Sequence, residues 1–454
     1  MHLQVLGRRN HRLALMGALL VCVFSASAFG ADADNNRNDR LRMWPTWRGP
    51  NFDGVVVEGN PPLTWSETEN VKWKVPVPDT SNSTPVVWGD RLIFLSNEAT
   101  AEDKRTPPPK DAGREIFMPV PAVPYRFNVV CLSRKDGSTL WTTKVAEVIP
   151  HEGYHPNTGF TSSSAITDGE YIWASFGSRG LHCLDMDGKI KWSVDLMEIL
   201  SFRAFGECVT PAIAGDTIIV VGDHVGQSRI WAFNKLTGDK LWEKDRDEDT
   251  SWTTPVMAMV DGRYQVIVAA ENAVRSYDVE TGDLVWEASG LTRLAIPSPV
   301  LGDGMVYVMT GEGAGSLMAI ELGHTGNLTD TDAIRWRLDR NQPYVTTPLL
   351  YGNKLYTLPK VSPSLSCYNA ETGEPFFESQ RLEGLKQIYS SAIGAAGRVY
   401  LTDRSGTTIV ISHSDEFEVL ATNSLDDDID ASLVVIGDEL YIKSKHYMYC
   451  IAEE

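Results

Sequence analysis

The chain has 454 residues, 43% hydrophobic content and a formal net charge of −19, which is enough apolar material for a large folded core. A surface this acidic repels phosphate backbones and anionic lipid, so we expect no nucleic-acid partner and no binding to an anionic membrane. The acidity favours cationic ligands only weakly, because it also serves solubility.

Residues 1–30 form a separate N-terminal segment. Arg8, Arg9 and Arg12 precede an uninterrupted apolar run over residues 13–24, and small residues suited to signal peptidase follow in "SASAFGADA". The run is too short and wrongly flanked for a membrane span, so it predicts a secretory signal peptide cleaved near residues 28–30. We therefore expect a periplasmic or secreted protein without a transmembrane segment.

The residues around that run indicate the export route. The pair Arg8-Arg9 could indicate the twin-arginine route, but His11 and Arg12 follow where apolar residues are wanted, which favours a Sec-type signal. Cys22 follows "LLV" and lies inside the apolar run, so the signal lacks a lipobox and we expect no lipid anchor.

An aromatic segment follows the signal. "WPTWRGPNFDG" (Trp44–Gly54) carries two Trp and two Pro residues ahead of the first predicted strand. Each indole buries a large apolar area on packing. We expect residues 31–69 to be an N-terminal extension docked on a single main domain that spans residues 70–454.

The main domain is a repeat. Units of four short strands, rich in Val, Ile, Tyr and Trp and bounded by Gly, Asn and Asp, recur about every 40–50 residues, as in "TPAIAGDTIIVVGDHVGQSRIWAFNKLTGDKLW". Each unit ends on a docking residue: Trp73, Trp141, Trp192, Trp242, Trp286, Trp336, Phe377 and Leu420. This period predicts the blades of a propeller.

The two ends of the repeat indicate how the ring closes. Trp73 precedes every inner strand, and the last unit has no docking strand after it. The eight inner strands begin near Ser83, Ser163, Thr210, Thr254, Ser298, Thr347, Ser391 and Ala431. We expect residues 70–75 to be the outer strand of the last blade, paired with residues 446–452, because this removes two exposed sheet edges. The predicted fold is an all-β, eight-bladed β-propeller of four-stranded antiparallel blades, with the ring closed by the N-terminal strand.

Four cysteines share one place in the repeat, which requires a small buried residue in the third strand. Cys131, Cys183, Cys367 and Cys450 stand where other units carry Ala232, Ser276, Ala319 and Val410. Equivalent positions in neighbouring blades are expected to lie too far apart for the Cα separation of roughly 4.4–6.8 Å that a disulfide needs. We interpret these cysteines as packed thiols, and the chain has no C-x-x-C spacing for a metal or a haem.

Two segments break the period. Residues 97–127, with Pro107–Pro109 and scattered charges, form a long loop between the second and third strands of the first unit. That loop lies on the same side as the blade-to-blade connections, which we call the top face, as an inert surface loop or as a lid on the central funnel. Residues 321–336 lengthen a hairpin on the opposite, bottom face, and we assign that hairpin no function.

The turns and docking residues resemble the PQQ-like (pyrroloquinoline-quinone-like) β-propeller repeat family. "SRKDGSTLW", "NKLTGDKLW" and "DVETGDLVW" carry the resemblance, and "WPTWRGP", "FGSRGLHCLDMDGKIKW" and "GRVYLTDRSGTTIVI" look typical of an exported, planctomycete-type branch. The resemblance covers residues 44–454 and implies the fold, whereas one fold hosts many functions. The family includes quinoprotein dehydrogenases, which oxidise alcohols or sugars with a quinone and Ca²⁺, and a non-enzymatic lipoprotein that assists outer-membrane protein assembly.

The chain departs from both kinds of relative. No two cysteines are adjacent, whereas quinoprotein alcohol dehydrogenases typically carry a vicinal pair beside the quinone. The family's Ca²⁺ ligands and catalytic base cannot be matched residue by residue. We therefore assign no catalytic residue and no metal ligand, and we expect no cofactor; PQQ and Ca²⁺ belong only to the dehydrogenase alternative.

The candidate ligand-binding residues lie in top-face loops, which converge on the mouth of the central channel. The loop "HEGYHPNTGF" offers His151, His155 and Asn157. Paired histidines could bind a metal or transfer protons, but a spacing of four in a Pro-containing loop implies no shared face. A structural or solvated role is the alternative.

Arginines form a second candidate group. Arg179, Arg203, Arg293 and Arg404 lie in top-face loops of different units and could hold a carboxylate or phosphate bidentately. The alternative is that each pairs with a neighbouring acidic residue, and Asp403 lies beside Arg404.

Acidic and amide residues form a third candidate group, in equivalent loops of three successive units: Asp223, His224, Glu271, Asn272 and Glu312. Converging oxygens suit a hard cation such as Ca²⁺, although the same residues make ordinary turns. The run of residues 426–430, "DDDID", is interpreted as a solvated loop rather than a cation site.

These observations favour an exported, non-catalytic propeller that acts as a binding or scaffold protein for an unknown protein, peptide or glycan. No nucleophile elbow, zinc-protease helix or dinucleotide fingerprint occurs in the chain. The alternative is a quinone- or metal-dependent oxidoreductase with its site at the top of the central channel.

Overall fold

The computed structural model describes residues 40–78, 81–108, 113–310, 315–340, 343–359 and 362–453. Residues 40–454 form one compact unit, and the predicted signal peptide lies outside the described residues. Within the described ranges, no helix has the length and apolar character needed to cross a bilayer.

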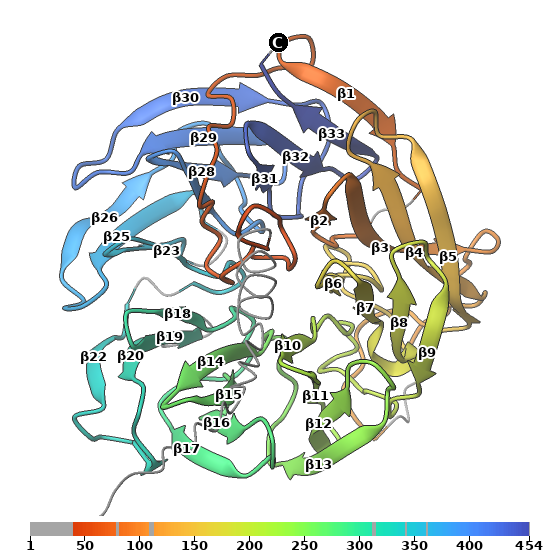
Figure 1. Ribbon diagram of the computed structural model, residues 1–454, viewed down its shortest axis with the longest axis vertical. Coiled ribbons are helices and arrows are strands. Elements are labelled where there is room, and N and C mark those ends of the chain that lie inside the picture. Colours follow the sequence, from red (N-terminus) through yellow and green to blue (C-terminus); the bar gives the residue numbers. More distant parts are fainter. Residues whose placement is uncertain are drawn as a thin grey trace, which may run out of the picture. The chain divides into compact units, whose positions relative to one another are not determined.

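The strands form eight sheets that follow one another around a central axis, which confirms the predicted propeller (Figure 1). Among the described residues the fold is all-β apart from the helical residues Arg40 and Leu41 and the 3-10 turn η1 (Gly177–Arg179). In each blade a short inner strand lies at the axis and an outer strand lies at the rim (Figure 1).

The first four blades contain these strands. Blade 1 has β2 (Val86–Trp88), β3 (Arg91–Ala99), β4 (Tyr125–Ser133) and β5 (Thr139–Val148). Blade 2 has β6 (Ile166–Thr167), β7 (Tyr171–Ser175), β8 (Leu181–Asp185) and β9 (Ile190–Val194). Blade 3 has β10 (Ala212–Ala214), β11 (Thr217–Gly222), β12 (Ser228–Asn234) and β13 (Lys240–Arg246). Blade 4 has β14 (Val256–Val260), β15 (Arg263–Val268), β16 (Val274–Asp278) and β17 (Leu284–Ala288).

The remaining blades complete the ring. Blade 5 has β18 (Val300–Gly302), β19 (Met305–Thr310), β20 (Ser316–Glu321) and β22 (Ile334–Leu338). Blade 6 has β23 (Leu349–Tyr351), β24 (Lys354–Thr357), β25 (Ser364–Asn369) and β26 (Pro375–Arg381). Blade 7 has β27 (Ile393–Ala395), β28 (Arg398–Thr402), β29 (Thr407–Ser412) and β30 (Val419–Ser424). Blade 8 has β31 (Val434–Ile436), β32 (Glu439–Lys443), β33 (Tyr447–Ile451) and β1 (Val71–Pro76).

The closure of the ring is as predicted. β1 is the outer strand of blade 8 and pairs antiparallel with β33, with Trp73 opposite Cys450 and Lys74 opposite Tyr449. The two ends of the chain therefore share one sheet, so that the first described strand and the last one hold each other in place.

The docking tryptophans join each blade to the next one. The Trp73 indole donates a hydrogen bond of 2.9 Å to the Arg134 carbonyl oxygen, at the turn between β4 and β5 of blade 1. Gly137 in that turn has φ of +73°, and a Cβ there would lie 2.8 Å from the indole ring. Glycine thus meets two requirements at once, a positive φ and room for an aromatic ring from the preceding blade.

Blade 4 departs from this arrangement. The hairpin of residues 321–336 has no short glycine turn, and its β21 (Gly326–Asn327) adds a fifth strand to blade 4, parallel to β17. Trp286 pairs with Gly326 across this addition and is fully buried. The lengthened bottom-face hairpin therefore covers the outer edge of the neighbouring blade, where a free strand edge would otherwise face solvent.

The shared cysteine position lies in the packed interior, as predicted. Cys131, Cys183, Cys367 and Cys450 are each fully buried in a third strand, and all are free thiols. Burial raises the pKa of each of these thiols to about 12, so they stay protonated and behave as small apolar groups.

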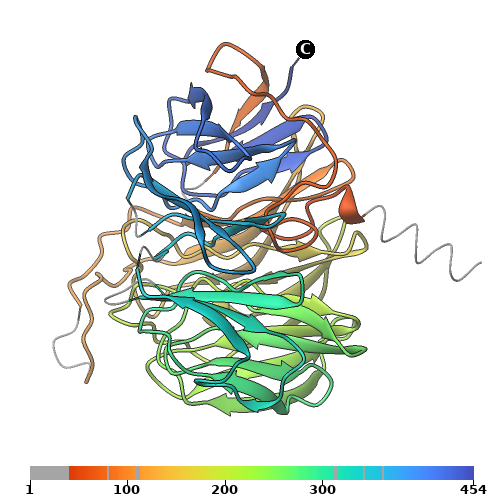
Figure 2. The ribbon, with the colours of Figure 1, turned by 90° about the vertical axis from the view of Figure 1, so that its left-hand side faces the viewer.

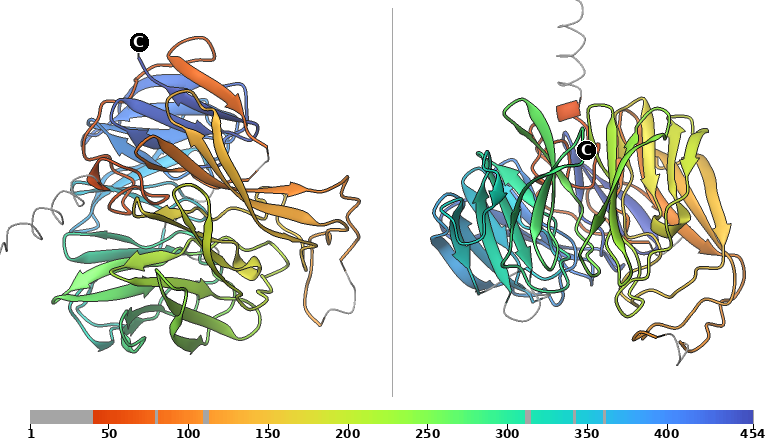
Figure 3. Two further views of the ribbon diagram at one scale, coloured as in Figure 1. Left: turned by 45° about the vertical axis from the view of Figure 1, so that its right-hand side comes forward. Right: turned by 90° about the horizontal axis from the view of Figure 1, so that it is seen from below.

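The N-terminal segment and the insertion of residues 97–127 lie on opposite sides of the ring (Figure 2). The N-terminal segment crosses the bottom face, where Trp44 bridges Val87 and Val55 bridges Gly394. The insertion of residues 97–127 extends β3 and β4 into an arm that leaves the ring from blade 1 (Figure 3). The bottom of the ring is thus covered, and any open approach to the axis lies on the top face.

Candidate functional site

The central channel is surrounded by a ring of hydroxyl groups, one from the start of each inner strand. In six of the neighbouring pairs, a backbone N–H of one blade donates a hydrogen bond of 2.9–3.1 Å to the hydroxyl oxygen of the next blade. The ring consists of Thr84, Ser164, Thr210, Thr254, Ser298, Thr347, Ser391 and Ser432. These neutral hydroxyls satisfy buried backbone donors and make the channel wall polar without charge.

The channel is narrow and closed from below. Its cavity volume is about 160 Å³, and Trp47 of the N-terminal segment lines it. The neighbouring Arg48 is almost completely buried, and its guanidinium donates to the carbonyl oxygens of Ala392 at 2.7 Å and Pro348 at 3.1 Å. Burial lowers the pKa of Arg48 to about 10. "WPTWR" is therefore the floor of the channel.

A second cavity of about 250 Å³, which we call the mouth pocket, adjoins the channel on the top face. The two share Asn82, Thr158 and Asp430. The blade-to-blade connections before blades 1, 2 and 8 and the top loop of blade 7 supply its walls, with Tyr154, Arg404 and Lys443 among the lining residues.

Arg404 is held firmly in this pocket. Its Nε and a terminal nitrogen donate to the two carboxylate oxygens of Asp430 at 2.6 and 3.0 Å, and its guanidinium lies 4.6 Å from the centre of the Tyr389 ring. Burial raises the pKa of Asp430, and the bidentate contact with Arg404 opposes that rise. The partner is not Asp403, which instead accepts bonds from the backbone of Ser405 and Thr407 in its own loop.

Asp430 corrects the interpretation of the acidic run as a solvated loop. Its side chain is only 13% exposed and fixes the orientation of Arg404, although Asp428 in the same run is exposed. Charge density in the sequence could not distinguish these neighbours, because the loop turns one carboxylate inward and another outward.

The histidine loop contributes to the mouth pocket through its later residues. The Asn157 side-chain amide donates to the Tyr389 hydroxyl at 3.0 Å, and its backbone carbonyl accepts from Asn82 at 2.9 Å. His155 supports the loop, since its Nδ1 accepts a hydrogen bond of 3.2 Å from the Asn157 backbone N–H. The pKa of His155 is lowered, mainly by burial and to a smaller extent by the positive charge of Arg404. His151 lies apart, against the Ile199 carbonyl at 2.8 Å.

Arg179 is paired away from the channel. It contacts Glu207 at 2.5 Å and lies over the rings of Phe127 and Phe160, and its side chain is 4% exposed. The acidic candidate Asp223 is also paired with an arginine. Arg246 donates to its two oxygens at 2.7 and 3.0 Å, and neither side chain of this pair is exposed.

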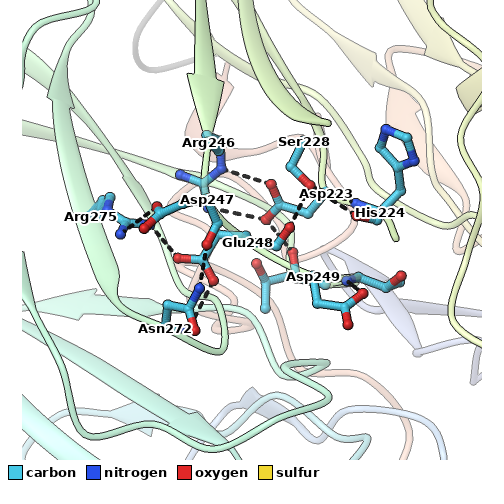
Figure 4. Close-up of polar contacts among 12 residues, drawn as sticks. Asp223, His224, Ser228, Arg246, Asp247, Glu248, Asp249, Asn272 and Arg275 are labelled. Carbon is cyan, nitrogen blue, oxygen red and sulfur yellow. Dashed lines mark hydrogen bonds and ion pairs between the residues drawn. The ribbon is translucent and has the colours of Figure 1, made fainter. Parts of the chain in front are cut away.

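Figure 4 shows the wider network around Asp223. Asn272 donates through its backbone to Glu248 at 2.9 Å, and Glu248 also binds Arg275. His224 contacts the neighbouring backbone, with its own N–H donating to the Ser228 hydroxyl at 2.9 Å. These carboxylates hold arginines and loop backbone together, so the network stabilises the connection between blades 3 and 4 rather than presenting oxygens to a cation.

Arg203 and Arg293 meet at a different place on the top face. Both guanidinium groups lie over the Phe202 ring, at 4.7 and 5.5 Å, and Arg203 also lies 4.4 Å from the ring of Phe117 in the insertion arm. The four candidate arginines therefore do not meet at one site. Arg404 lines the mouth pocket, Arg179 is buried against Glu207, and Arg203 and Arg293 stack with phenylalanines.

The insertion arm does not cover the channel with any residue that the structure describes. It rests on the loops of blades 2 and 3, where Arg114 contacts Glu152 at 2.6 Å and the Ser201 carbonyl at 2.8 Å. None of the described residues of 97–127 lines the channel or the mouth pocket.

Glu271 lies next to the blade 4 loop residue Asn272, and Glu312 lies outside the described residues.

Sequence reasoning missed Asn82 and Lys443, which line the mouth pocket, and Tyr389, which lines the channel. Lys443 carried a usable signal, because the equivalent position of every other unit holds an uncharged residue: Leu95, Ser175, Val221, Ala269, Met309, Leu358 and Thr402. Asn82 and Tyr389 stand in connections whose paths the repeat does not specify.

The residues present do not fit a quinone with a bound metal ion in the channel. Across the described residues, no three His, Cys, Asp or Glu side chains come together as metal ligands need to. Asp430, a carboxylate that lines the channel, holds Arg404, and Glu207, next to the channel residue Cys208, holds Arg179. The channel volume of about 160 Å³ is also below the roughly 300–1,000 Å³ of typical cofactor sites.

Comparison with known proteins gives the following likenesses. A family model described as "Outer membrane protein assembly factor BamB" matches residues 126–329. BamB from Moraxella catarrhalis has 17% identity and a TM-score of 0.52, and the match covers 78% of this chain and 98% of that one. The quinohemoprotein alcohol dehydrogenase from Comamonas testosteroni has 10% identity and a TM-score of 0.60, with 93% of this chain and 82% of that one covered.

A computationally designed protein, Ika8, has 12% identity and a TM-score of 0.56, with 84% of this chain and 99% of that chain covered. No curated protein matches the chain in sequence. At these identities the solved structures share the fold with this chain, and a fold carries no activity by itself.

Proposed function

Since this chain is a PQQ-like β-propeller, we propose that it is a non-catalytic binding or scaffold protein, exported from the cell, that takes its ligand at the mouth of the channel on the top face. The ligand reaches the axis only from the top, because the N-terminal floor closes the bottom. The assembly-factor name of the matching family supports a scaffold role.

The observation that carries the proposal is the pairing of the top-face charges. Asp223 holds Arg246, Asp430 holds Arg404 and Glu207 holds Arg179, each at 2.5–2.7 Å at its shortest contact. An acid or base that acts on a substrate needs access to the substrate and a pKa suited to proton transfer. Carboxylates that are paired with guanidinium groups instead fix the orientation of those arginines in the top-face loops, which suits a binding surface.

The alternative is a quinone-dependent oxidoreductase, a class to which one structural neighbour belongs by name. The two functions differ in one assay. The purified mature protein is incubated with pyrroloquinoline quinone and Ca²⁺, with Ca²⁺ alone as the control, and its thermal midpoint and dye-linked oxidation of alcohols and sugars are measured.

We expect no quinone-dependent shift of the thermal midpoint and no dye reduction. A shift accompanied by turnover would replace the proposed function with the oxidoreductase. Export is checked separately, by sequencing the N-terminus of the protein recovered from the periplasm or the medium; a mature chain that begins near residue 29–31 is expected from the sequence.

A further inference from the structure

The mouth pocket and the central channel form one continuous space that is approached from the top face. Their cavity volumes are about 250 and 160 Å³, and both cavities are lined by Asn82, Thr158 and Asp430. Trp47 of the N-terminal floor lines the lower cavity. Each volume is below the roughly 300–1,000 Å³ of drug-sized ligand pockets, so the space suits one small ring that enters end-on.

The charged side chains that line this space are already engaged within the protein. Arg404 donates to both carboxylate oxygens of Asp430 at 2.6 and 3.0 Å, and Lys445 lies 4.0 Å from Asp428. Lys443 is 1% exposed, and its ammonium group donates to a backbone carbonyl oxygen. Among the described residues that line the channel itself, Asp430 is the only charged one. The space therefore favours an uncharged ligand, because a charge on the ligand would be desolvated there without a counter-ion.

The ring of eight hydroxyl groups keeps hydrogen-bonding capacity for a ligand. Six of its oxygens each accept one backbone N–H, which leaves a proton and a second lone pair on each. None of the eight donates its proton to an acceptor in the part of the chain that the structure describes, and Ser164 and Thr254 make no side-chain hydrogen bond there at all. Groups that can both donate and accept match the hydroxyl groups of a sugar.

Two amide oxygens and three aromatic rings complete the wall. The side-chain nitrogens of Asn82 and Asn157 donate to the Asn157 backbone carbonyl at 2.9 Å and to the Tyr389 hydroxyl at 3.0 Å. Their side-chain oxygens accept no hydrogen bond from any described residue, so both remain acceptors for ligand hydroxyl groups. Trp47, Trp252 and Tyr389 line the channel, and their rings offer apolar surface to the C–H face of a pyranose.

We infer that this space binds a neutral hexopyranose, free or as the terminal residue of a neutral glycan. Its hydroxyl groups bind the two amides and the hydroxyl ring, and its C–H face packs on the channel aromatics. This inference rests on the proposed binding function and names the ligand class for it. A peptide suits the space less well, because a chain that enters end-on presents a charged amino or carboxyl terminus, which would find no counter-ion there.

The test is a titration of the mature full chain followed by saturation-transfer difference NMR. The neutral probes are D-glucose, D-galactose and D-mannose. Their charged counterparts are the uronate and the 2-amino sugar of each, measured at a pH at which the amine is protonated. We expect at least one neutral sugar to bind with a Kd of about 10 mM or tighter, and its charged counterparts to bind at least about tenfold more weakly.

The methyl glycoside of the sugar that binds distinguishes the two sources of the ligand. Retained binding identifies a linked terminal residue, and lost binding identifies the free sugar. Either result supports a neutral hexopyranose.

Variants test the assigned groups. Thr254→Val removes one hydroxyl of the ring but keeps the shape of the side chain and the backbone bond to Ser298, and should weaken binding of the neutral sugar about fivefold. Thr357→Val is the matched control, because the Thr357 hydroxyl is also buried and has no partner among the described residues but lies on blade 6, outside both cavities. If Thr254→Val does not fold, Asn82→Ala removes an amide at the partly exposed rim and should also cost about fivefold in affinity.

No binding of any neutral sugar up to about 50 mM, or equal or tighter binding of the charged counterparts, would overturn the inference and leave the proposed binding function standing. Binding of the neutral peptide N-acetyl-dialanine amide in place of every sugar would do the same. Affinity for the neutral sugar that is unchanged in both Thr254→Val and Asn82→Ala, or reduced equally in Thr357→Val, would also overturn it. Quinone-dependent turnover is the separate result that removes the proposed function itself.

Discussion

The backbone N–H of Ser432 in blade 8 donates a hydrogen bond of 3.1 Å to the Thr84 hydroxyl in blade 1, across 348 positions of sequence. The same contact recurs between other neighbouring blades around the axis, and this bond joins the last blade to the first. The inner end of the propeller is therefore held by side chain to backbone bonds, while the outer rim is held by the pairing of β1 with β33.

Removing one of these hydroxyl groups should destabilise the ring. Ser391→Ala leaves the buried Thr347 backbone N–H without its acceptor, which lies at 3.0 Å, and should lower the free energy of unfolding by about 1–3 kcal/mol. Urea unfolding followed by tryptophan fluorescence measures the change. Ser391→Thr keeps a hydroxyl acceptor, like the threonines at this position in other blades, so its unfolding free energy should stay close to that of the parent protein. Equal urea midpoints for the two variants would refute this account.

The docking residue of the closing blade should matter more than an exposed one. Trp73 is 9% exposed and binds the Arg134 carbonyl, so Trp73→Ala should cost about 3–5 kcal/mol of unfolding free energy. Leu241 lies on an outer strand and is 49% exposed, and Leu241→Ala should change stability by about 0.5 kcal/mol or less. Denaturant midpoints for the two variants give the comparison, and similar values would contradict the docking role.

Removing β33 should open the ring. A chain that ends before residue 446 leaves β1 without its partner and exposes the edges of both blade 8 and β1. We expect this truncated protein to aggregate or oligomerise in size-exclusion chromatography with light scattering. A soluble monomer that unfolds cooperatively would show that the closing pair is dispensable.

The buried pair of Asp223 and Arg246 gives a test by double-mutant cycle. Asp223→Asn leaves a buried guanidinium without its anion, and Arg246→Met leaves the carboxylate unpaired, so each should cost about 3–5 kcal/mol. The double variant should cost less than the sum, with a coupling of about 1 kcal/mol or more. Arg381→Met, which breaks the exposed contact with Glu383, is the control and should cost less than about 1 kcal/mol.

Stability should fall on mild acidification because of buried histidine. His182 is 5% exposed and its ring contacts the Ser193 hydroxyl and the Arg179 carbonyl, and burial lowers its pKa. The unfolded chain then takes up a proton below about pH 6.5 while the folded chain does not, so stability is full above that pH and declines below it until the lowered folded pKa is reached. Thermal midpoints between about pH 7.5 and 5 should fall less steeply in His182→Gln; identical slopes would assign the pH effect to other groups, such as His413.

Which parts of the molecule could be predicted from sequence depends on the range of the interactions. Most units repeat the same three features, namely a docking tryptophan, a turn glycine and a small residue in the third strand. Eight repetitions of this pattern therefore predict both the blades and their number. The position of Trp73 before the first inner strand also predicted how the ring closes, because only a strand from the other end of the chain could complete its sheet.

The charged pairs could not be predicted in this way. Arg404 takes Asp430 rather than its neighbour Asp403, and Asp223 takes Arg246, which precedes the next blade. Both choices depend on the paths of irregular connections, where no period repeats and a turn of one residue changes which side chain faces inward. Lys443 is an intermediate case. Its charge, where the other blades have uncharged residues, marked the position as unusual, but the sequence did not show what the side chain faces.

The sequence by itself determined the number of blades, the positions that dock them and the pairing of the two ends, because these follow from local periodicity and from the need to leave no strand edge open. Only the tertiary structure decided which loops meet over the axis, that Trp47 and Arg48 close the channel from below, and that Asn82, Arg404 and Lys443 share one pocket. The physical reason is that hydrophobic burial in a repeated unit is specified every few residues, whereas polar contacts between top-face loops form only after all eight sheets have taken their places around the ring.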